Sequence, residues 1–87
     1  MVTNPPKSVT ESVNDIVIVE LRARGISHSS AAKALGIGRD TFARRLSGPQ
    51  GFTAAELERV ATLIGLAPSE LLSRAERQSA AGQGAAA

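Results

Sequence analysis

The feature that most constrains the fold is the short stretch Gly36-Ile37-Gly38, which separates two short amphipathic segments. Gly36 tolerates the positive φ with which helices commonly end, so the chain can turn sharply there. Ile37 can fill the angle between two helices, and the small side chains of Ala31 and Ala32 allow their backbones to approach. These residue sizes predict a helix-turn-helix over residues 27–47.

The segment after this turn, residues 39–47, has one apolar face and one charged face. Phe42 and Leu46 are four residues apart and therefore share a face, which we expect to point inward. The opposite face or its margins then carry Arg39, Asp40, Ala43 and Arg44. In the helix before the turn, Ser27 is the expected N-cap.

A further helix is expected before residue 25, where apolar side chains recur with a helical period from Val13 to Leu21. A strand is the alternative, because "DIVIVEL" is rich in β-branched residues. Two capping pairs can begin this helix, namely Ser8 with Glu11 or Ser12 with Asp15.

Two more helices are expected after residue 52. Thr53 with Glu56 forms a capping box, inside a hydrophobic staple of Phe52 with Leu57. Pro68 suits the first turn of the last helix. The apolar side chains expected to face inward there are Leu66, Leu71, Leu72 and Ala75.

These signals predict an all-α fold of four or five short helices without a sheet. We expect residues 1–9 to be a flexible tail, because Pro5-Pro6 prevents an early helix. Residues 10–77 then form the folded domain. Residues 78–87, rich in Ala and Gly, are expected to be disordered.

Charge is unevenly distributed along the 87 residues, although the formal net charge is only +2. Residues 22–47 carry a net charge of +5, between flanks of −2 and −1. A basic middle indicates a local site for a polyanion, although solvated helix faces also produce such excursions.

Several function classes are disfavoured by composition. With one His, no Cys and scattered carboxylates, no catalytic pair, metal site or cofactor is proposed, so an enzyme is not expected. Aromatic residues for RNA stacking are lacking outside the presumed core. The sequence has no long apolar run, no signal-peptide core and no evident small-molecule site. The expected location is therefore the cytoplasm, without a membrane partner.

Three motifs, "RGIS", "AAKALGI" and "LERVATLIGLAPSEL", occur in order within residues 21–72. This region resembles the Cro and lambda-type phage repressor family, also called XRE. The sequence "RRLSG" after the third helix is most similar to that of small actinobacterial or actinophage members. The resemblance implies a compact five-helix domain whose third helix reads the major groove of double-stranded DNA.

The resemblance also implies individual roles. Base reading would fall on Arg39, Asp40 and Arg44, with Thr41 and Ala43 beside them. Phosphate contacts would come from Ser27, His28, Ser29, Lys33, Arg45, Ser47 and Gln50. Many family members have Ser or Thr where this chain has Gly38, and an apolar residue at the position of Arg45. Arg45 would thus be free for phosphate, and the choice between Arg44 and Arg45 as base reader stays open.

Together these features predict a sequence-specific DNA-binding transcription regulator, a Cro-like protein or small immunity repressor that blocks a promoter. A homodimer on an inverted repeat is expected, with Leu66, Leu71 and Leu72 as candidate contacts, although these leucines also suit the core. The alternative is an antitoxin-type or other protein-interaction module. The operator and a phage or host origin stay open.

Overall fold

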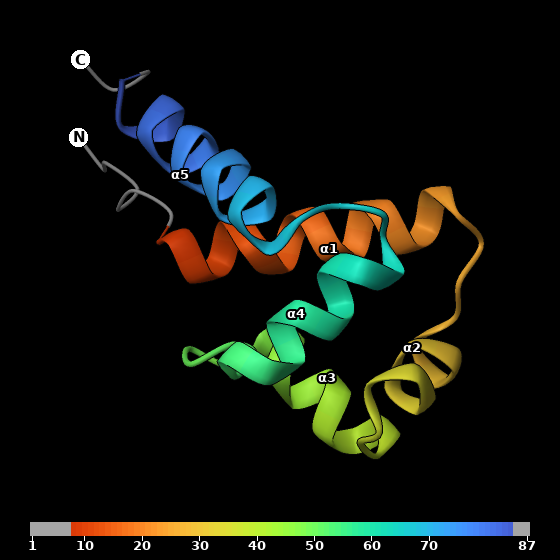
Figure 1. The fold of residues 1–87 in the computed structure, drawn as a ribbon. Helices are drawn as coiled ribbons and strands as arrows, with labels where there is room; N and C mark the ends of the chain where they lie inside the picture. The colour runs from red at the N-terminus through yellow and green to blue at the C-terminus, as the bar shows by residue number, and fades with distance from the viewer. Residues whose placement is uncertain (1–7, 85–87) are drawn as a thin grey trace.

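The computed structural model describes residues 8–84, with the side chains of α5 placed through Ala80. This part of the chain forms five α-helices and no strand (Figure 1). The helices are α1 (Val9–Ala23), α2 (His28–Leu35), α3 (Arg39–Ser47), α4 (Ala54–Leu63) and α5 (Pro68–Gly84). The all-α prediction is confirmed, and the strand alternative for "DIVIVEL" is wrong because this segment lies within α1.

Helix α1 begins with the first of the two predicted capping pairs. Ser8 Oγ accepts a hydrogen bond from the Glu11 amide at 3.1 Å, and the Ser8 amide donates to Glu11 Oε1 at 3.3 Å. The reciprocal bonds satisfy two amides that the helix itself cannot pair. Ser12 instead lies buried inside the helix.

Three helices, α1, α2 and α4, end with the same local arrangement, a glycine at positive φ followed by an apolar residue, and the last two illustrate it. Gly36 has a φ of 74°, and the amide of Ile37 donates to the carbonyl of Ala32 at 3.0 Å. Gly65 has a φ of 75°, and the amide of Leu66 donates to Ala61 at 2.9 Å. In both places the apolar residue packs against the core, which fixes the angle to the next helix.

Helix α4 begins as predicted. Thr53 Oγ1 accepts from the Glu56 amide at 3.2 Å, and the Thr53 amide donates to Glu56 Oε1 at 3.0 Å. Phe52 and Leu57 are both partly buried against the core, as a hydrophobic staple requires.

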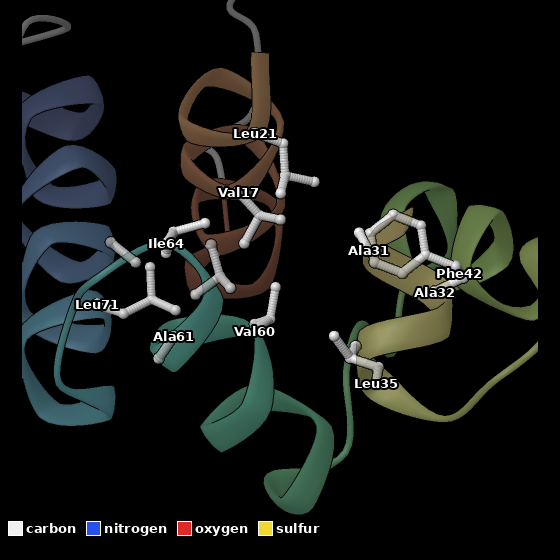
Figure 2. Close-up of a cluster of buried hydrophobic side chains, with 12 residues drawn as sticks. Val17, Leu21, Ala31, Ala32, Leu35, Phe42, Val60, Ala61, Ile64 and Leu71 are labelled. Atoms are coloured by element: carbon white, nitrogen blue, oxygen red, sulfur yellow. The ribbon is translucent and has the colours of Figure 1, made fainter. Parts of the chain in front are cut away.

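Every helix contributes buried side chains to the core (Figure 2). Val17 of α1, Leu35 of α2, Phe42 of α3, Val60 of α4 and Leu71 of α5 are all completely buried. Each such side chain contributes about 1.5–3 kcal/mol by leaving water. Phe42 is the largest of the buried side chains, so the core determines the orientation of α3.

The helices divide into two packed groups. Helix α1 packs mainly against α5, whereas α2 packs against both α3 and α4. Figure 1 shows α2 and α3 on the side of the molecule away from α5. The helix-turn-helix is therefore supported from behind by α1 and α4.

The structure differs from the expected domain limits at both ends. Residues 8 and 9 cap and begin α1, and α5 continues through Gly84 rather than ending at residue 77. Alanine is the best helix former and Ser79 is buried, so this Ala-rich segment continues α5. The predicted tails at 1–7 and 85–87 lie outside the described residues.

Candidate nucleic-acid interface

The roll of α3 about Phe42 sets which residues point outward. Phe42 is buried, and Leu46 is partly buried against the core. The side chains on the other side are exposed, as predicted: Arg39, Asp40, Ala43 and Arg44. Thr41, between the two faces, is half-buried.

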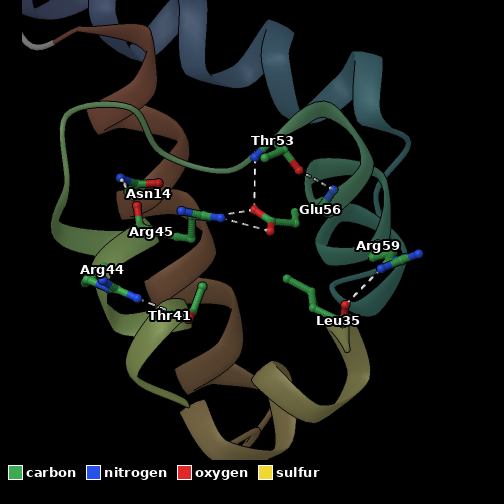
Figure 3. A network of polar contacts seen from close by, with 8 residues as sticks. All are labelled: Asn14, Leu35, Thr41, Arg44, Arg45, Thr53, Glu56 and Arg59. Atoms are coloured by element: carbon green, nitrogen blue, oxygen red, sulfur yellow. Dashed lines mark hydrogen bonds and ion pairs between the residues drawn. The ribbon is translucent and has the colours of Figure 1, made fainter. Parts of the chain in front are cut away.

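The two outward arginines of α3 form no ion pair within residues 8–80. Arg44 Nη2 donates to Thr41 Oγ1 at 3.3 Å along the same helix (Figure 3). This bond orients the Arg44 guanidinium without neutralising its charge. Both cations are therefore available to an anionic partner.

The start of α2 forms a second part of the surface. Ser27 Oγ accepts from the Ser30 amide at 3.1 Å, which confirms its role as N-cap. His28 and Ser29 follow as exposed residues, and the His28 ring meets the Phe42 ring edge-on with 5.6 Å between centroids. Amides at a helix start, together with the helix dipole, attract anions. Lys33 is exposed on the same helix.

The residues after α3 complete the predicted contact set. Ser47 and Gln50 are exposed. The hydroxyl of Ser47 donates its one proton to the carbonyl of Ala43 at 2.9 Å, and its oxygen can still accept a hydrogen bond from a second partner.

Arg45 is not the free cation that the sequence predicted. Its Nε donates to Glu56 Oε1 at 2.8 Å and its Nη2 donates to Oε2 at 3.4 Å (Figure 3). The hydrogen bond from Arg45 is the largest effect that lowers the pKa of Glu56, and the carboxylate in turn raises the pKa of Arg45. The prediction fails because the capping box presents a buried carboxylate beside the last turn of α3.

Two further polar anchors were not predicted. Asn14 Nδ2 donates to the carbonyls of Arg45 at 3.2 Å and Leu46 at 2.9 Å, and Arg59 Nη1 donates to Leu35 at 2.9 Å. They hold the last turns of α3 and α2, where carbonyls lack helical partners. Asn14 could have been found, because it lies on the buried stripe of α1 beside Val13 and Val17.

The predicted dimer contacts separate into buried and exposed residues. Leu71 is completely buried, so its assignment to a dimer surface is wrong. It points into the core that α5 shares with α4 (Figure 2). Leu66 is partly buried against the same core, whereas Leu72 is 39% exposed.

Residues 8–84 contain no group of three or more metal-binding side chains close enough to hold an ion. None of the described helices has the length and apolar character needed to cross a membrane.

Residues 18–76 match the sequence model of a family described as "Cro/C1-type HTH DNA-binding domain". The chain belongs to this family. Its helix-turn-helix is thus that of a DNA-binding transcription regulator, and the sequence resemblance is confirmed. Among curated proteins, no significant match to the chain was found.

A solved structure supports the fold of this Cro/C1-type chain. The clp gene regulator ClgR from Corynebacterium glutamicum superposes with a TM-score of 0.79 at 15% sequence identity. The match covers 92% of this chain and 85% of the other. At this identity the likeness concerns the fold alone.

Proposed function

We propose that the protein is a sequence-specific regulator that inserts α3 into the major groove of a double-stranded DNA operator. The observation that supports this most strongly is the outward face of α3. There Arg39 and Arg44 are exposed and form no ion pair among the described residues, while Phe42 fixes the helix from behind.

Each outward residue of α3 suits a different base edge. Arg39 and Arg44 can each donate two hydrogen bonds to guanine O6 and N7, which discriminates by about 1–3 kcal/mol against a wrong base. Asp40 can accept from cytosine N4 and repels phosphate, so it selects rather than attaches. Ala43 lets the helix sit deeply and can contact a thymine methyl group.

Phosphate contacts on either side would set the register of α3. The first turn of α2 supplies the amides of His28 and Ser29, behind the Ser27 cap, and Lys33 adds a cation on the same helix. Ser47 and Gln50 lie exposed at the other end of α3. Such contacts position the protein but carry no sequence information.

The regulator is proposed to act as a Cro-like protein or small immunity repressor that occupies a promoter in the cytoplasm. One such domain offers a small contact area, so pairing on an inverted repeat would raise affinity. The half-sites would then lie about 34–36 Å apart, one turn of DNA. Among Leu66, Leu71 and Leu72, Leu72 is the exposed residue, and it is the proposed dimer contact.

The proposal is tested by selecting bound duplexes from a random library with the wild type and with Arg44→Ala. We expect the wild type to enrich one motif. Arg44→Ala should relax the preference at one position by roughly tenfold or more, in line with about 1–3 kcal/mol for a lost bidentate contact.

Lys33→Ala is the matched control, because it also removes one exposed cation. It should weaken all duplexes alike and make the salt dependence of log K shallower by about 0.9. If Arg39→Ala, Asp40→Ala and Arg44→Ala all weakened every duplex equally, base reading by α3 would be rejected.

An antitoxin-type or other protein-interaction module is the second candidate, and one observation favours it. Val19 of α1 is 60% exposed and lines a groove of about 540 Å³ between α1 and α5, with Ile16, Ile18 and Arg74. A Val19→Asp variant that lost regulation in cells while binding DNA normally would support this candidate. Unchanged regulation would remove it.

A further inference from the structure

The last turn of α3 is held from two sides. Asn14 of α1 donates to the carbonyls of Arg45 and Leu46, and Glu56 of α4 binds the Arg45 guanidinium with both oxygens (Figure 3). These contacts join residues 31, 32 and 11 positions apart in the chain. The end of α3 is thus clamped by side chains of α1 and α4.

The Glu56 carboxylate in this clamp is held in place independently of Arg45. Glu56 Oε1 also accepts from the Thr53 amide at 3.0 Å, and only 8% of Glu56 is exposed. By contrast, Glu20–Arg24 and Glu70–Arg74 are exposed pairs on single helices, at 3.5 and 3.8 Å. A buried carboxylate needs its partner far more than an exposed one does. Arg45 is therefore drawn inward toward Glu56.

We propose that Glu56 is a positioning residue for DNA recognition, which fixes the end of α3 through Arg45 and neutralises that cation. Arg39 and Arg44 are then the cations that α3 offers to DNA, beside the exposed carboxylate of Asp40. A cation at position 45 would add affinity for every duplex, because phosphate contacts do not depend on sequence. Its neutralisation therefore lowers affinity for all duplexes alike, whereas the preference for the operator depends on how firmly the end of α3 is held. This inference rests on the proposed function.

Glu56→Gln tests the inference with little change in shape. Gln also serves at this position of a capping box, so α4 should still begin at Thr53, and circular dichroism should show a folded chain. The freed Arg45 charge should make the slope of log K against log salt steeper by about 0.9 per subunit. Lowering salt from about 200 to 50 mM would then raise affinity about 3.5-fold more than in the wild type. Preference for the selected operator over a scrambled duplex should fall.

Glu58→Gln is the matched control. It removes the same charge from the same helix, but the exposed Glu58 side chain makes no hydrogen bond or ion pair with α3. Its salt slope should equal that of the wild type. An equal change of the salt slope in Glu56→Gln and Glu58→Gln would overturn the inference. The loss of one negative charge anywhere on α4 would then explain both results.

Arg45→Gln provides the second, independent variant. It removes the cation but keeps a donor for Glu56, and its salt slope should equal that of the wild type. In the double variant Arg45→Gln/Glu56→Gln, the effect of Glu56→Gln should disappear. If Arg45→Gln alone made the slope shallower by about 0.9, Arg45 would be a phosphate ligand and the inference would fail.

The two proposals fail in different ways. The salt slopes are measured on the selected operator and on an arbitrary duplex. A wild type that binds both equally contradicts the proposed function. A wild type that prefers the operator, with Glu56→Gln unchanged in slope and preference, contradicts the inference alone. Absence of binding to any duplex would overturn both.

Discussion

Glu56 links the stability of the protein to pH. The hydrogen bond from Arg45 is the main reason why the pKa of this carboxyl group is below its usual value, and burial only partly opposes it. Thr53 adds further hydrogen bonds in the same direction. The capping box of α4 and the ion pair with α3 therefore both depend on the ionised form of Glu56.

The sign of the pH dependence follows from this lowered pKa. The stabilisation is fully present above the unfolded pKa, about 4.3 for Glu, and is lost as pH falls through the lower folded value. We expect the urea concentration at the unfolding midpoint of the wild type to decrease as the pH is lowered through this range. Glu56→Gln should be less stable than the wild type at neutral pH and should lose less on acidification. The account is contradicted if the urea midpoints of Glu56→Gln and the wild type decrease equally on acidification. Glu58→Gln is the control and should follow the wild type.

Phe42 supports the surface that Arg39 presents, and the two residues should be separable by mutation. Phe42→Ala removes the largest buried side chain and should cost about 3–5 kcal/mol in the free energy of unfolding. Arg39→Ala should stay within about 0.5 kcal/mol of the wild type, because its side chain is exposed. Urea denaturation measures both. Equal losses would mean that Phe42 does not fix the roll of α3.

Among the helices, α3 depends most on its surroundings. It has nine residues, and its N-cap is Gly38, which makes no side-chain cap bond. A helix of this length is marginal in water without tertiary contacts. The contacts of Asn14, Glu56 and Phe42 therefore replace what the segment lacks locally.

Removing the side-chain amide of Asn14 should destabilise α3 more than α1, although Asn14 belongs to α1. Asn14→Ala leaves the carbonyls of Arg45 and Leu46 without their partner, which should cost about 1–3 kcal/mol. Hydrogen exchange should increase most for the amides in the last turn of α3. Ser29→Ala, at an exposed position, is the control. An Asn14→Ala variant as stable as this control would contradict the clamp.

The helix limits could be predicted where the signals are local. The Thr53–Glu56 box, the Ser27 cap and the Gly36 turn each act within a few residues, so the printed sequence contains them in full. The extension of α5 could not be predicted in the same way. After residue 77 the helix continues with a buried Ser79, and a composition rich in Ala and Gly does not by itself distinguish such a helix from a disordered tail.

At the scale of the whole molecule, the exposure of the candidate residues on α3 could be predicted from the sequence, whereas the ion pair of Arg45 could not. Spacing from Phe42 was enough to place Arg39 and Arg44 outward. The fate of Arg45 required knowing that Glu56, on another helix, lies beside it. Helical periodicity predicts the face of the helix on which a residue lies, but it does not predict which residue of another helix contacts that face.

The division of the fold into α1–α5 and α2–α3–α4 groups gives the central claim its most direct measurement. Isotope-labelled protein is titrated with the selected duplex, and amide chemical shifts are followed by NMR. The account predicts that the largest shifts fall in residues 27–33 and 38–50, with little change around Val19 or in α5 outside the proposed dimer contact at Leu72. Largest shifts in the groove between α1 and α5, with α3 unaffected, would contradict it.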